Sequence, residues 1–141
     1  MKRFWISWIA AFVFIFLWGL LYNGILLRDT FVEVQIASHL FRSREEMMSL
    51  FHWIIIGDAG LALSFVMIYA SGFAGRGIAG GIRLGILLEI LAISARCMIY
   101  AAQPFPAKFM ILATIGGFVE MIGAGIIVGA IYKSRATAAP N

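Results

Sequence analysis

Four long, mostly apolar stretches constrain this sequence more than any other feature. They span residues 4–27, 44–70, 78–101 and 107–132. As helices they are long enough to cross the roughly 30 Å hydrocarbon core of a bilayer, because that takes about 20 residues. Of the 141 residues, 62% are hydrophobic and 13% are charged, and a soluble domain of this length has too little interior to bury so much apolar surface. We therefore expect an all-α integral membrane four-helix bundle, with residues 1–141 as one transmembrane domain in the lipid bilayer.

The connections between these stretches predict how the helices follow one another. Residues 4–27 form an apolar run of 24 residues, longer than the apolar region of a secretory signal, and no small-x-small cleavage pattern follows it. We expect this run to remain as the first helix. The Gly-rich residues 71–77 predict a tight turn. Pro104 and Pro106 end the third helix, because proline lacks the amide hydrogen and disfavours helix in the residue before it. Short connections of this kind give two antiparallel hairpins.

The connection of residues 28–43 is the longest polar segment between helices. Ser43 and Glu46 have the spacing of a capping box, in which each side chain bonds to the other residue's backbone N–H. The second helix is therefore expected to start directly after the serine and to continue to residue 70. Between residues 30 and 42 apolar and polar residues interleave, which favours a short segment at the membrane interface. A β-strand over residues 30–36 is the alternative.

The placement of lysine and arginine predicts the orientation in the membrane. One side of the predicted bundle carries six basic residues: Lys2, Arg3, Arg76, Arg83, Lys133 and Arg135. The other side carries four basic residues together with four acidic ones: Arg28, Arg42, Arg44 and Lys108 with Asp29, Glu33, Glu45 and Glu46. Cytoplasmic loops are enriched in lysine and arginine, so both termini are expected in the cytoplasm.

Charged residues within the apolar stretches cost about 2.5–3.5 kcal/mol each and therefore mark candidate sites. Away from the ends of these stretches, the charged residues are Asp58, Glu89, Arg96 and Glu120. Glu89 lies 12 residues before Ala101 and Glu120 lies 12 residues after Lys108, near the outer ends of their predicted helices, which puts their carboxyl groups about 18 Å down, near the bilayer midplane. Asp58 and Arg96 are expected closer to the outer surface. The sequence thus predicts two layers: an ion pair between Asp58 and Arg96, and a contact between Glu89 and Glu120 in which at least one carboxyl group is protonated.

Small residues gather on the third and fourth predicted helices. G-x-x-x-G steps occur twice in overlap on the third helix and once on the fourth, and further glycines flank Glu120 at helical spacing. Small residues allow two helices to approach closely in a membrane. We expect helix packing at Gly77, Gly81, Gly85, Gly116, Gly117, Gly123, Gly125 and Gly129.

These charged residues allow three functional interpretations. In the first, they lock the bundle or dock a partner, and the protein is an accessory or structural subunit, either a homo-oligomer or the partner of a larger membrane protein. In the second, Glu89 and Glu120 titrate in a proton-linked transporter or channel for a small solute. No continuous polar path leads from them toward the cytoplasm, which favours the first interpretation. The third is a small membrane enzyme that acts on a lipid-like substrate at Asp58, Glu89 and Arg96.

Other residue types give no further site. His39 and His52 lie 13 residues apart, which is not a metal-ligand spacing, so no metal or cofactor is expected; a haem ligand at His52 is the alternative. Cys97 is interpreted as a small buried residue. No catalytic residue is assigned, because no nucleophile–base set or phosphate-binding loop occurs, and enzymatic chemistry is disfavoured.

Most tryptophan and tyrosine residues fall near helix ends, as in an interfacial aromatic belt, and basic residues flank the apolar stretches. The net charge of +4 therefore does not indicate nucleic-acid binding.

Two segments carry a resemblance to known proteins. GGIRLGILLEI (residues 80–90) and GGFVEMIGAGIIVGAIYK (residues 116–133) resemble small four-helix bacterial inner-membrane proteins of unknown function, with Gly-rich third and fourth helices and a short polar tail. The likeness covers about half of the chain. It implies a compact four-helix bundle in the bacterial cytoplasmic membrane, with residues 133–141 as the polar tail. It implies no activity and no functional residue.

Overall fold

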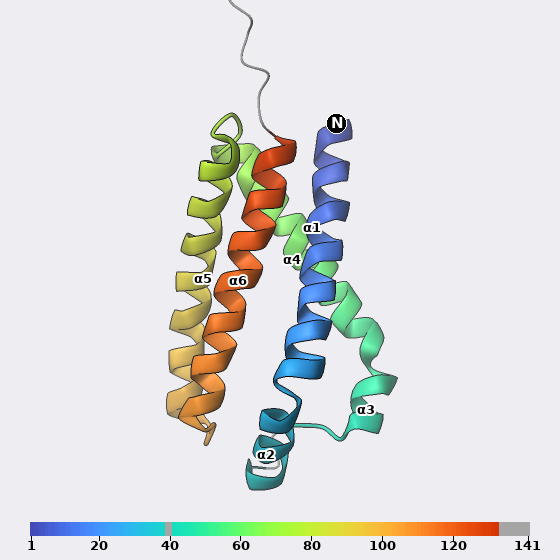
Figure 1. Ribbon diagram of the computed structural model, residues 1–141, viewed down its shortest axis with the longest axis vertical. Helices are drawn as coiled ribbons and strands as arrows, with labels where there is room; N and C mark the ends of the chain where they lie inside the picture. The colour runs from blue at the N-terminus through green and yellow to red at the C-terminus, as the bar shows by residue number, and fades with distance from the viewer. Residues whose placement is uncertain (39–40, 133–141) are drawn as a thin grey trace, which may run out of the picture.

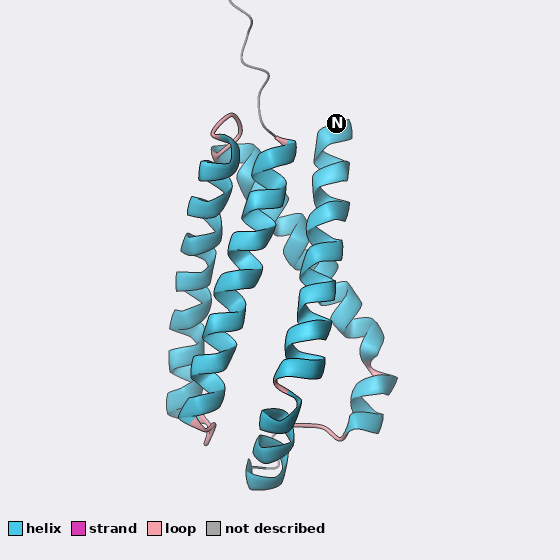
Figure 2. Ribbon diagram, in the orientation of Figure 1, coloured by secondary structure: helices cyan, strands magenta, loops and turns pink. Residues whose placement is uncertain are grey.

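The computed structural model describes residues 1–38 and 41–132, and all the regular structure in these residues is helical (Figure 2). Within this part of the chain, four segments are long and apolar enough to cross a membrane: Lys2–Leu26, Phe51–Gly72, Gly77–Ala102 and Ala107–Ile131. They indicate a multi-pass membrane protein, as the apolar stretches predict. The predicted boundaries agree with these segments to within two residues, except at the start of the second helix.

The first half of the chain runs the length of the molecule and returns (Figure 1). Helix α1 (Lys2–Leu21) continues into a short π-helix, η1 (Tyr22–Leu26), and then into α2 (Arg28–Ser38). After the short α3 (Arg44–Ser49), helix α4 (Phe51–Gly72) returns behind α1 at a marked tilt (Figure 1).

The second half of the chain is an antiparallel hairpin of α5 (Gly77–Ala102) and α6 (Ala107–Ile131), which lies beside α1 (Figure 1). The amino terminus, the α4–α5 turn and the end of α6 lie at one end of the molecule. We call this the basic end, since Lys2 and Arg3 lie there. The opposite end, which holds α2 and the α5–α6 turn, is called the α2 end.

The α5–α6 hairpin is packed backbone against backbone. A Cβ atom on Gly81 would overlap the carbonyl group of Gly125, and a Cβ atom on Gly125 would overlap the carbonyl group of Gly81. Main-chain atoms cannot move aside as a flexible side chain can, so the two helices lie this close only because these positions are glycine. Four glycines meet backbone atoms of the other helix in this way: Gly81, Gly85, Gly125 and Gly129.

Two further glycines form the α4–α5 turn. Gly75 and Gly77 have φ angles of 90° and 58°, a left-handed conformation that residues with a Cβ atom rarely adopt. The carbonyl group of Gly77 accepts a 2.8 Å hydrogen bond from the hydroxyl of Tyr69, which ties the end of α4 to the start of α5. The same carbonyl is the main-chain group nearest to Gly129 of α6. The predicted packing position Gly77 therefore acts through its backbone.

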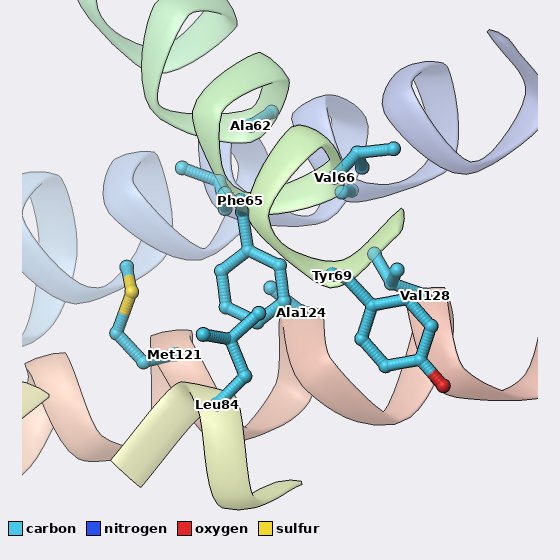
Figure 3. Close-up of a cluster of buried hydrophobic side chains, with 10 residues drawn as sticks. Ala62, Phe65, Val66, Tyr69, Leu84, Met121, Ala124 and Val128 are labelled. Carbon is cyan, nitrogen blue, oxygen red and sulfur yellow. The ribbon is translucent and has the colours of Figure 1, made fainter. Parts of the chain in front are cut away.

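The buried core lies where α1 and α4 meet the hairpin (Figure 3). Phe65, Val66 and Tyr69 of α4 are fully buried together with Ala124 and Val128 of α6. All five residues belong to the half of their helix that is nearer the basic end. In a membrane, packing of this kind, more than the removal of apolar surface from water, holds helices together.

Residues 28–38 form the helix α2, so the strand alternative is wrong. A cluster of aromatic rings connects this region to the α5–α6 turn, with centroids 5.0–5.6 Å apart: Phe31, Phe41, Phe105 and Phe109. Each such pair contributes about 0.5–1.5 kcal/mol beyond its buried area. An ion pair between Lys108 and Glu33, 3.6 Å apart, is exposed and adds little.

The capping box at the start of α3 is confirmed. The backbone N–H of Ser43 donates to Glu46 Oε2 at 2.9 Å, and the N–H of Glu46 donates to Ser43 Oγ at 3.3 Å. The prediction of one continuous helix over residues 44–70 is wrong, because α3 ends at Ser49 and α4 begins after Leu50. The hydroxyl of Ser49 donates to the carbonyl of Glu46 at 2.7 Å. Side-chain bonds of this kind compete with the helical backbone bond and favour a break.

Candidate functional site

A buried ion pair lies in the middle of α5. Glu89 is 1% exposed, and its Oε1 atom pairs with Nη1 of Arg96. The two residues are seven positions apart, or two turns, so they share one face of the helix. Helical side chains lean toward the amino terminus of their own helix, and Arg96 therefore reaches back along α5 to Glu89. The arginine side chain is 26% exposed.

Helix α6 makes room for this ion pair at Gly117. A Cβ atom there would lie 2.5 and 2.6 Å from the two carboxyl oxygens of Glu89, and 2.8 Å from Arg96 Nη2. A Cβ atom on the neighbouring Gly116 would overlap the ring of Tyr22. The two glycines thus allow α6 to contact the ion pair of α5 and an aromatic ring of the first helix at the same level.

Two more carboxyl groups, Asp58 of α4 and Glu120 of α6, are half-buried. Neither makes an ion pair or a hydrogen bond within residues 1–38 and 41–132. Glu120 lies within electrostatic reach of Asp58, Glu89 and Arg96. We call these four residues the charge group. It contains three carboxyl groups and one guanidinium group.

The predicted separation of these charges into two layers is wrong. Arg96 forms its ion pair with Glu89 instead of Asp58. Asp58 interacts electrostatically with Glu120. The prediction counted residues along helices that were assumed to be parallel. That assumption fails for α4, which is tilted relative to the other long helices (Figure 1). The backward lean of the arginine side chain also moves its charge toward the level of Glu89.

The charge group lies at the edge of the buried core. Met121, next to Glu120, and Ala62, one turn after Asp58, both belong to that core. Between Asp58 and the start of α4, residues 52–57 are all exposed. Asp58 therefore lies directly after the exposed part of α4.

Two aromatic side chains of the first helix bind the backbone of α6. Trp18 Nε1 donates to the carbonyl of Gly116 at 3.0 Å, and the hydroxyl of Tyr22 donates to the carbonyl of Leu112 at 2.8 Å. The two rings are stacked, with centroids 5.3 Å apart. Trp18 is too deep for the interfacial aromatic belt expected of most tryptophan and tyrosine residues, and neither hydrogen bond follows from that expectation. The signal that could have found them is the spacing of Trp18 and Tyr22, four residues apart on one helix face.

The remaining predicted positions lie away from the charge group. Gly123 faces the ring of Phe14. His52 is exposed beside Trp53, with ring centroids 5.5 Å apart, whereas His39 lies outside the described residues. Among the residues that are described, no group of three or more His, Cys, Asp or Glu is placed to hold a metal ion. Cys97 is exposed, so its interpretation as a buried residue is wrong.

Two cavities, of about 590 and about 340 Å³, lie at the basic end and on the exposed side of α5. Neither is lined by a residue of the charge group. The chain matches no protein-family model, no curated protein and no solved structure.

Proposed function

We propose that this protein is an accessory subunit of a membrane assembly, in which Asp58 and Glu120 hold a transmembrane helix of a partner that carries a lysine or arginine. One observation carries the proposal: Arg96 is paired with Glu89. This leaves Asp58 and Glu120 without an ion pair or hydrogen bond in the described part of the chain.

The proposal includes the placement of the chain in the bacterial cytoplasmic membrane as a four-helix bundle with both termini in the cytoplasm. The asymmetry of basic residues supports this orientation. Acidic residues occur only between Asp29 and Glu120, and none occurs in the first 28 or last 21 residues. Lys2, Arg3 and Arg76 lie near the basic end, so that end is the cytoplasmic one.

Two unpaired carboxylates in a membrane are unfavourable in free energy, which favours a partner helix that carries a basic residue. A charged side chain at the centre of a transmembrane helix costs about 2.5–3.5 kcal/mol, and an opposite charge removes much of that cost. The exposed first half of α4, including Ile54 and Ile56 at 45% and 55% exposure, offers an apolar surface beside Asp58. A partner helix that packs on this surface places its cation next to the carboxyl groups.

Site-specific photocross-linking in a bacterial membrane tests the proposal. A photoreactive amino acid at Gly57, whose added Cβ would meet nothing within 4 Å, samples the surface next to Asp58. The same amino acid at Leu91, 67% exposed on α5, is the control. We expect a product at Gly57 that contains a protein with a lysine or arginine inside a membrane span. We also expect Asp58→Asn/Glu120→Gln to abolish this product while the amount of folded protein stays unchanged.

Two results contradict the proposal. Identical products from Gly57 and Leu91 would mean that the cross-links report only random contacts in the membrane. A product that survives Asp58→Asn/Glu120→Gln would mean that the carboxyl groups do not hold the partner.

A second candidate function is proton-linked transport, which the composition of the charge group favours. With three carboxyl groups and one arginine, protons instead of a partner's cation can neutralise the excess negative charge. Since Glu89 is paired with Arg96, the titrating groups in this case are Asp58 and Glu120. Carboxyl infrared difference spectra of the protein in lipid, recorded across pH, test this candidate. A titrating band that disappears in Asp58→Asn or Glu120→Gln, but not in Glu89→Gln, supports it, and the absence of any titrating band refutes it.

A further inference from the structure

The cavity of about 590 Å³ at the basic end is built from three separate parts of the chain. Residues 1–4 at the start of α1 form one wall, Ala74 and Gly75 of the α4–α5 turn form the second, and Tyr132 at the end of α6 forms the third. The packing that brings these helix ends together also creates the cavity.

The charge at this cavity is positive. Lys2 and Arg3 line it, and both side chains are exposed. The nearest acidic residues in the sequence are Asp29 after α1, Asp58 and Glu89 on either side of the turn, and Glu120 in α6, each at least 12 residues from a residue that lines the cavity. An anion that enters therefore meets two cations and no nearby carboxylate in the described part of the chain.

Residues that line the cavity also carry neutral hydrogen-bond donors. The backbone N–H groups of Ala74 and Gly75 donate no hydrogen bond within the described residues. Gly75 has a left-handed conformation, and consecutive N–H groups in turns with such a residue commonly bind anions. The hydroxyl of Tyr132 has no hydrogen-bond partner in the described residues either. Partial burial raises the pKa of Tyr132, so this hydroxyl stays protonated and can donate.

We propose that this cavity binds the phosphate group of an anionic phospholipid. Two cationic side chains, backbone N–H groups and a tyrosine hydroxyl suit a phosphate oxyanion. The half-buried Phe4 adds an apolar wall, and the four candidate spans end at or near this level, which suits a headgroup whose acyl chains lie along the helices. Basic pockets between transmembrane helices are known to bind anionic headgroups. This inference goes beyond the proposed function and depends only on the chain lying in a membrane.

Native mass spectrometry of the purified full chain in detergent micelles tests the inference. Phosphatidylglycerol and phosphatidylcholine are added in turn, and the lipid retained by the protein is measured. In Lys2→Gln/Arg3→Gln we expect phosphatidylglycerol affinity to fall about 25-fold, roughly five-fold for each basic residue. Arg42→Gln/Arg44→Gln, which removes the same charge near the other end of the molecule, is the matched control and keeps the wild-type affinity. Micelles make the result independent of any effect of Lys2 and Arg3 on membrane orientation.

A second variant and a competitor complete the test. Tyr132→Phe, which keeps the ring and removes the donor, should weaken phosphatidylglycerol binding without changing phosphatidylcholine binding. Inorganic phosphate is added as competitor: if it displaces the lipid only at concentrations far above that of the lipid, the headgroup is the ligand. Displacement at equal concentration would overturn the lipid assignment in favour of soluble phosphate. Equal retention of the two lipids, or an equal loss of affinity in the control variant, would overturn the site.

Discussion

The two halves of this molecule are held together in different ways. Toward the basic end, α4 contacts the α5–α6 hairpin through fully buried side chains such as Phe65 and Tyr69. Toward the α2 end, residues 52–57 of α4 are exposed, and the first helix is joined to α6 by hydrogen bonds from Trp18 and Tyr22. One half is closed by packing, and the other is open along α4.

The charge group lies at the boundary between these halves. In the closed half, α4 packs against the α5–α6 hairpin through buried side chains. In the open half, α4 has an apolar surface next to Asp58 that no helix of the described residues covers. The carboxyl groups of Asp58 and Glu120 thus lie at the border between the buried core and the exposed part of α4. A second molecule can reach them there.

The largest expected effect is on the closed half. Gly81→Leu should destabilise the protein by about 5 kcal/mol, above the usual 1–3 kcal/mol for overpacking, because its side chain overlaps the backbone of Gly125. Thermal unfolding in detergent, followed with size-exclusion chromatography, measures the loss. Gly57→Leu is the matched control in the open half, since an added Cβ there meets nothing within 4 Å, and it should unfold like the wild type. Equal stability of the two variants would contradict the difference between the halves.

The next largest effect is expected at the boundary. Arg96→Met leaves Glu89 buried without its partner, and removal of one member of a buried pair costs about 3–5 kcal/mol. Glu89→Gln/Arg96→Met removes the charge as well as the pair and should recover most of that loss. The wild type, the single variants Glu89→Gln and Arg96→Met, and the double variant are compared by thermal unfolding. If the double variant is no more stable than Arg96→Met, Arg96 does not stabilise the protein through its ion pair with Glu89.

A smaller effect is expected from the bonds that join α6 to the first helix. Trp18→Phe keeps an aromatic ring and removes the hydrogen bond to the carbonyl of Gly116, which should cost about 1 kcal/mol. Trp5→Phe at the other end of α1, where the side chain is 52% exposed, serves as control and should change stability little. A loss from Trp18→Phe no larger than that from Trp5→Phe would show that this bond does not hold the open half.

The smallest effect concerns α3, which precedes the exposed part of α4. Hydrogen bonds from the backbone N–H and the hydroxyl of Ser43 hold the pKa of Glu46 below its ordinary value of 4.5. Because the folded pKa is lower than the unfolded one, this capping box stabilises α3 above about pH 4.5, and the contribution is lost as the pH falls through the folded pKa. Ser43→Ala removes the hydroxyl bond and should raise the pKa of Glu46 part of the way to 4.5. Carboxyl ¹³C chemical shifts measure this pKa, and an unchanged value would contradict the assignment.

The helices could be predicted from the sequence because their signals are local. Apolar length gives the spans, glycine and proline give the turns on either side of α5, and the Ser43–Glu46 spacing gives the start of α3. The tilt of α4 did not follow, since tilt is set by packing against neighbouring helices and not by the length of the apolar stretch. The π-helix at Tyr22–Leu26 and the break at Leu50 also escaped prediction, because each depends on a single change of backbone bonding within an otherwise helical pattern.

At the candidate site too, local features could be predicted from the sequence and features that depend on packing could not. Charged residues in apolar stretches are visible in any sequence, so Asp58, Glu89, Arg96 and Glu120 stand out at once. Their pairing depends on two features that are not local. One is the tilt of α4 relative to the other long helices (Figure 1), and the other is the space at Gly117 that accommodates the ion pair against α6. Residue counting along parallel helices therefore gave the wrong partner for Arg96.

The most direct test of the central proposal is binding to a synthetic transmembrane helix in nanodiscs. Two Leu/Ala peptides that differ only in a central lysine or a central leucine are labelled for energy transfer to a fluorophore at Cys97, which is exposed on α5. We expect the lysine peptide to associate about 5- to 30-fold more tightly, as a polar contact of 1–2 kcal/mol between membrane helices gives. We also expect Asp58→Asn/Glu120→Gln to remove the difference. Equal association of the two peptides with the wild-type protein would contradict the proposal.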